Sequence, residues 1–265
     1  AARNMTFSDS SGVLKQFLKI TRIMKMQFQT WAAICLIAAI TSCHPARLVY
    51  SPGLPSETAA LSVKGRNGFQ IGQKLSFGGY QTGKIRRGWT TGYEVPFRVS
   101  FRGAKEKLSY DLVSPDGARA EVSCISKFKA IEYQMVKDYF SIPLQVENFF
   151  AGNIFLQESG TNWDFIVYNP EGGYLLGESS GYAQNGAQRI DFIPIRKLEG
   201  QPAWLDPLTV YGYELALGEK ILGAVSLMNK GEVRLADGVD AELKLVVASL
   251  ATGLLLRHSP ADSQG

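Results

Sequence analysis

Apolar and polar positions alternate with a period of two residues in many short segments of the chain. The stretch Val95–Arg102 alternates in this way, as a half-buried strand does. Glycine-containing turns separate the segments. The pattern predicts a mainly β, antiparallel protein with strands at Phe69–Ile71, Lys74–Phe77, Lys84–Arg87, Val95–Arg102, Leu108–Val113, Arg119–Val122, Trp163–Tyr168, Tyr174–Gly177, Arg189–Ile195, Leu208–Leu217, Lys220–Met228 and Glu232–Leu235.

Two of the predicted hairpins share a turn sequence. Ser114-Pro115-Asp116-Gly117 and Asn169-Pro170-Glu171-Gly172 each place proline at the first central position, an acid at the second and glycine after it. This order suits a type I turn followed by a glycine bulge. It indicates a repeated meander of antiparallel strands.

The segment Asp240–Arg257 departs from the two-residue period and predicts a helix. Asp240 suits the N-cap, Glu242 the first turn, and Arg257 with His258 the last turn. Leu245–Leu256 contains no charged residue, and a helix that is apolar on all sides must be buried. We therefore expect this helix inside the β structure.

An antiparallel sheet followed by an apolar C-terminal helix resembles the tubby-like architecture, which tubby, LURP-one-related proteins and phospholipid scramblases share. The resemblance covers roughly residues 68–257 and implies a closed barrel around a hydrophobic helix. It also implies a membrane-associated binding or scaffolding role. The alternative is a β-sandwich or a lipocalin-like barrel with the helix packed outside.

The N-terminal part of the chain has the organisation of a signal peptide. Met24–Gln29 carries a positive charge, and Trp31–Ile40 is almost wholly apolar but shorter than a membrane-spanning helix. Ile40-Thr41-Ser42-Cys43 follows and resembles the lipobox of bacterial lipoproteins, in which the cysteine thiol is acylated. The resemblance implies lipid attachment at Cys43.

These features predict a domain organisation. Residues 1–23 are upstream read-through, 24–42 the signal peptide, 43–60 a lipidated and proline-containing tether, 61–258 one β-rich domain and 259–265 a disordered tail. No aspartate follows Cys43 and no acidic cluster lies near it. By resemblance to lipoprotein sorting rules, we expect a cell-envelope protein on the periplasmic face of the outer membrane.

The charge and the cysteine content of the predicted domain argue against nucleic-acid binding and against an internal disulfide. Residues 1–42 hold five basic and one acidic side chain, so the net charge of +4 lies entirely there and the rest is neutral. A neutral domain offers no basic field for nucleic acid. Only Cys124 remains in the predicted domain, which therefore forms no internal disulfide; we expect a buried, inert thiol.

Catalysis is not expected. The two histidines, His44 and His258, lie outside the strand region, which argues against a histidine-dependent triad or a multi-histidine metal site. We expect no catalytic residues, metal or cofactor. Glycoside hydrolysis by paired carboxylates is the remaining enzymatic alternative, with candidates near aromatic residues at Asp164, Glu171, Glu178 and Asp191.

The best binding candidate is Lys84, Arg86 and Trp89. Lys84 and Arg86 project from one strand face, and Trp89 could meet a lipid headgroup or a sugar. A second candidate surface holds Asn162, Trp163, Tyr168 and Tyr174. The expected function is a noncatalytic binding or structural role at the membrane, with an envelope protein, lipid or glycan as partner. A dedicated lipid- or carbohydrate-binding module is the alternative.

Overall fold

The computed structural model describes residues 46–54, 58–66, 72–88, 106–126, 149–168, 180–202 and 209–257. Thirteen strands and one long helix lie in these ranges. Their bounds are β1 Leu61–Ser62, β2 Ser76–Phe77, β3 Tyr80–Thr82, β4 Arg86–Gly88, β5 Glu106–Val113, β6 Arg119–Ser126, β7 Phe149–Leu156, β8 Asn162–Tyr168, β9 Gly181–Gln184, β10 Arg189–Ile195, β11 Gly212–Leu217, β12 Lys220–Ser226, β13 Glu232–Leu235 and α3 Ala241–Leu256.

The described strands form one antiparallel sheet that closes into a barrel. The order is β1-β13-β12-β11-β10-β9-β8-β7-β6-β5-β3-β2, and β4 pairs with β5 beside β3. The two ends of this order meet at a bridge between Lys64 and Ser76, whose backbone N–H and C=O groups exchange bonds of 2.9 and 3.1 Å. This isolated bridge brings the two ends of the strand order together and leaves the barrel nearly closed.

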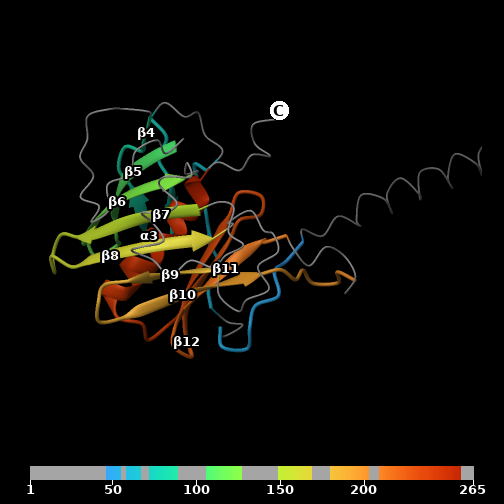
Figure 1. The fold of residues 1–265 in the computed structure, drawn as a ribbon. Coiled ribbons are helices and arrows are strands. Elements are labelled where there is room, and N and C mark those ends of the chain that lie inside the picture. Colours follow the sequence, from blue (N-terminus) through green and yellow to red (C-terminus); the bar gives the residue numbers. More distant parts are fainter. Residues whose placement is uncertain are drawn as a thin grey trace, which may run out of the picture. The chain divides into compact units, whose positions relative to one another are not determined.

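Helix α3 occupies the barrel interior and lies behind the labelled strands in Figure 1, where it is red. Every residue from Leu245 to Leu256 is buried, and α3 contacts β6, β12 and β13. Asp240 accepts a 2.8 Å bond from the Leu243 N–H and caps the helix. The predicted barrel with a buried C-terminal helix is confirmed, and the alternative with an external helix is wrong.

The local predictions can be compared strand by strand. β10 and β13 have the predicted bounds, and α3 lies within the predicted 240–257 with Asp240 as its N-cap. Arg257 is the C-cap of α3 and does not lie in its last turn as predicted, and His258 lies outside the described residues. The turn at Ser114–Gly117 is confirmed, because Gly117 has φ +94° and its N–H bonds to the Ser114 carbonyl at 3.0 Å. The matching turn at 169–172 lies outside the described residues, as do the predicted strands at 69–71, 95–102 and 174–177.

Residues 47–54 lie on the barrel and belong to its packing. Leu48 is 5% exposed and forms a bridge with Leu198, and Leu54 is 4% exposed. The expected tether over 43–60 therefore includes chain that packs with the domain. The predicted read-through, signal peptide, Cys43 and C-terminal tail lie outside the described residues.

Candidate functional site

The barrel interior is packed with side chains from strands and helix. Tyr110 on β5 is fully buried, and its hydroxyl donates a 2.7 Å bond to the Ser249 carbonyl of α3. Burial raises the pKa of the Tyr110 hydroxyl well above its usual value. A Cβ at Gly152 would come within 2.4 Å of the Phe165 ring, so backbone and ring are in close contact. The helix thus fills the space that a lipocalin-like barrel would keep for a ligand.

Two arginines bind the carboxyl end of α3: Arg66, which lies in a turn after β1, and Arg87 on β4. Arg66 donates from Nε to the Leu255 carbonyl at 3.1 Å, and Arg87 donates to the Leu256 carbonyl at 2.7 Å. Arg66 also bonds the carbonyls of Leu227 and Asn229, at 2.7 and 3.1 Å. The last turn of α3 contains no basic residue of its own. These arginines offset the negative end of the helix dipole, and they do so from remote parts of the chain.

Tyr50 and Ser51, near the start of the described chain, contact Arg234 and Glu214 on the outer side of the barrel. The Ser51 N–H donates a 2.6 Å bond to Glu214, whose side chain is buried on β11. The guanidinium of Arg234 lies 4.7 Å from the centre of the Tyr50 ring. Burial, followed by the nearby Glu232 carboxylate, raises the pKa of Tyr50.

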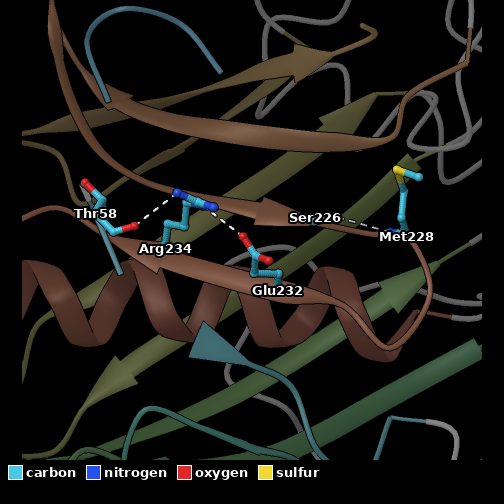
Figure 2. Close-up of polar contacts among 5 residues, drawn as sticks. All are labelled: Thr58, Ser226, Met228, Glu232 and Arg234. Atoms are coloured by element: carbon cyan, nitrogen blue, oxygen red, sulfur yellow. Dashed lines mark hydrogen bonds and ion pairs between the residues drawn. The ribbon is translucent and has the colours of Figure 1, made fainter. Parts of the chain in front are cut away.

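Figure 2 shows Arg234 between Thr58 and Glu232. Arg234 donates to the Thr58 carbonyl at 3.0 Å and to the Glu232 carboxylate at 2.8 Å. In the same view, the Ser226 hydroxyl accepts a 3.4 Å bond from the Met228 N–H after β12. Arg234 thereby joins strand β13 to the segment that precedes β1. The sequence analysis missed the bond between Arg234 and Thr58, because it joins residues 176 positions apart.

The predicted binding residues lie around β4. Lys84 and Arg86 are exposed, whereas Ile85 between them is 5% exposed and belongs to the core. This alternation places Lys84 and Arg86 on the outer side of the barrel. Arg87 is half-buried and points to the helix end, so it belongs to a different environment. Trp89 lies outside the described residues.

The strand register extends this basic face into a polar row. One residue from each of seven neighbouring strands pairs with the next on the side away from the core: Arg86, Ser109, Ser123, Asn153, Asp164, Gln184 and Arg189. Asn153 donates a 2.9 Å bond to Asp164, and both side chains are buried. Arg189 lies 4.0 Å from the Tyr182 ring centre. Such a row becomes visible only once the register is known.

Two of the four carboxylate candidates, Asp164 and Asp191, lie in the described residues, and each has a protein partner. Asp164 is bonded to Asn153, and Asp191 forms a 2.9 Å ion pair with Arg189. Glu171 and Glu178 lie outside the described residues. In the described part of the chain, no three His, Cys, Asp or Glu side chains are grouped as a metal ion would require.

The second candidate surface is divided between two faces. Trp163 is 1% exposed and packs in the core, whereas Tyr168 lies on the opposite face of β8, with its ring edge against Phe149. Tyr174 lies outside the described residues. Cys124 is 2% exposed, and burial raises the pKa of its thiol, which suits an inert core residue.

The chain matches no protein-family model, no curated protein and no solved structure. The tubby-like resemblance therefore stays a prediction at the level of family, although the architecture it implies is present. Within the described ranges, no helix has both the length and the apolar character needed to cross a membrane.

Proposed function

We propose that this chain is a lipid-anchored protein of the bacterial cell envelope, held through Cys43 on the periplasmic face of the outer membrane. Its barrel has a noncatalytic binding or structural role towards an envelope protein, lipid or glycan. The observation that carries the proposal is the position of Arg47. Arg47 lies four residues after the lipobox cysteine, and its carbonyl accepts a 2.9 Å hydrogen bond from the Glu199 N–H. In sequence, Cys43 precedes this bond by only four positions, so a lipid on Cys43 would be attached close to the folded domain along the chain.

The packed interior supports a noncatalytic role. Substrate pockets in barrels lie in the interior or at its mouth, and here α3 fills the interior while Arg66 and Arg87 bind its end. The described carboxylates Asp164 and Asp191 are engaged with protein partners. No observation among the described residues favours the carboxylate-dependent hydrolase.

The test is the intact mass of the mature protein after expression of the full chain in a Gram-negative host. We expect a product that begins at Cys43 and carries three acyl chains. Two or more chains hold a protein stably on a bilayer, whereas one holds it marginally. The matched control, Cys43→Ser, should remain unacylated. A wild-type product without lipid on Cys43 would contradict the proposal.

A lipid- or glycan-binding site at Lys84 and Arg86 is the second candidate function. The observation that favours it is their joint exposure on one face, in register with the polar row. Titration with anionic phospholipid and with oligosaccharides should show saturable binding that Arg86→Ala weakens. Arg119→Ala, which removes an exposed arginine from β6, is the control. Equal affinity of the two variants would remove this site.

A further inference from the structure

A short two-stranded ribbon lies where the chain first contacts the barrel. Leu48 and Leu198 pair in an antiparallel bridge, the Val49 N–H bonds to the Lys197 carbonyl at 3.0 Å, and the Glu199 N–H bonds to the Arg47 carbonyl at 2.9 Å. We call residues 46–50 with 196–199 the anchor ribbon. The backbone hydrogen bonds hold residues 47–49 against residues 197–199, so the ribbon is part of the folded barrel domain.

The outer side of the anchor ribbon combines basic and apolar groups. Leu48 is buried, whereas Arg47 and Val49 on either side of it are exposed. Val49 is 44% exposed and is the large apolar side chain most open to solvent in the described ranges. Lys197 lies across from Val49 and is also exposed.

Two further charged groups belong to the same ribbon. Glu199 is exposed and lies across from Arg47, and Arg196 is half-buried beside Lys197. Alternation places Arg196 on the inner side with Leu198, so the outer side of the ribbon has two basic groups, Arg47 and Lys197, and one acidic group, Glu199. A net positive edge with an exposed apolar side chain suits the headgroup region of an anionic bilayer.

The number of residues between Cys43 and the anchor ribbon limits how far the ribbon can lie from a membrane that holds Cys43. Arg47 lies four positions after Cys43, and four extended steps of the chain reach about 14 Å at most. We infer that the anchor ribbon is a membrane-contacting surface of the barrel that binds anionic phospholipid headgroups; the inference rests on the proposed function. With acyl chains on Cys43, the domain cannot stand away from the bilayer, and it presents Val49 and Lys197 to the headgroups.

The opposite end of the barrel lies far from the ribbon. Strand β10 runs from Arg189 to Ile195, just before the ribbon, so its far end lies about 20 Å away. The turn at that far end includes the exposed Ala187, and Lys220 is exposed at the corresponding end of β12. These two residues provide controls for the test.

The experiment places a fluorescent label on the mature, lipidated full-length product. Val49→Cys and Ala187→Cys each provide one reactive thiol, because Cys124 is buried and Cys43 is acylated. The proteins are reconstituted in vesicles of phosphatidylcholine with phosphatidylglycerol that contain a lipid-borne quencher. We expect several-fold stronger quenching of the label at position 49 than of the label at position 187. Lys197→Glu should reduce quenching at position 49, and Lys220→Glu should not.

The outcomes separate this inference from the proposed function. Acylated protein with equal quenching at both positions overturns the anchor ribbon alone. Equal quenching in vesicles of phosphatidylcholine with and without phosphatidylglycerol overturns the choice of anionic headgroups. Protein without lipid on Cys43, shown by intact mass, overturns both the proposed function and the ribbon's place at the membrane.

Discussion

The contact between Tyr110 and α3 allows a quantitative test of how the helix fits the barrel. Tyr110→Phe removes a buried 2.7 Å bond to the Ser249 carbonyl. The Ser249 carbonyl keeps its backbone hydrogen bond within the helix, so the free energy of unfolding should fall by about 1 kcal/mol, the usual net value of one hydrogen bond. For a domain of this size, the melting temperature should fall by roughly 2 to 4 °C. Circular dichroism follows both transitions: urea unfolding gives the change in the free energy of unfolding, and thermal unfolding gives the change in melting temperature.

Gly253 makes the test sharper, because a Cβ there would lie 3.2 Å from the Tyr110 hydroxyl and 3.4 Å from the Phe150 ring. Gly253→Ala alone gains about 0.8 to 1 kcal/mol of helix propensity, but the methyl presses on a hydroxyl that its hydrogen bond holds in place. In Tyr110→Phe the hydroxyl is gone. The same substitution should then be more favourable by about 0.5 to 1 kcal/mol, measured as the coupling energy of a double-mutant cycle. Additive effects would refute the packing described here.

Three further predictions concern the helix ends and pH. Arg66→Ala should lower the free energy of unfolding by about 2 to 3 kcal/mol, because three carbonyls lose a charged donor, one of them exposed to water. Lys64→Ala, at an exposed neighbouring position, should change it little in the same urea assay; equal losses would contradict the role of Arg66. Asp240→Ala should cost about 1 kcal/mol by removing the N-cap, and its denaturation midpoint tests this. Burial raises the folded-state pKa of Cys124 and of Tyr110 above their unfolded values, so the stability that these two groups contribute is fully present at neutral pH and is lost as the pH rises above about 8.5, where the unfolded thiol begins to ionise. Urea unfolding across alkaline pH checks this, and an unchanged slope in Tyr110→Phe would count against that tyrosine's part in it.

Local pattern was enough to predict some elements. β10 has the predicted bounds because apolar and polar residues alternate along it in the sequence. β13 has the predicted bounds because it is a short segment between turn residues. Strand β7 was not predicted, because Phe149–Ile154 is buried on both faces and shows no alternation. Strand β9 is short and begins at Gly181, so it offers little pattern.

The candidate site was predictable only in part. Alternation around Ile85 placed Lys84 and Arg86 on one exposed face, and the described burial agrees. The polar row beyond Arg86 depends on strand register, which a one-residue shift would destroy. The contact between the Arg234 guanidinium and the Tyr50 ring joins segments that are far apart in the sequence. No local signal could have indicated either.

The sequence by itself determined that the protein is mainly β, that 240–257 forms an apolar helix and that this helix must be buried. These properties follow from period, capping and the absence of charge, which act between near neighbours in the chain. Tertiary structure alone decided how the barrel closes at Lys64 and Ser76, and that Arg66 and Arg87 bind the helix end. It also decided that the chain contacts the barrel from Arg47 onward. Each of these joins segments far apart in sequence, whose pairing depends on the packing of the whole barrel around α3.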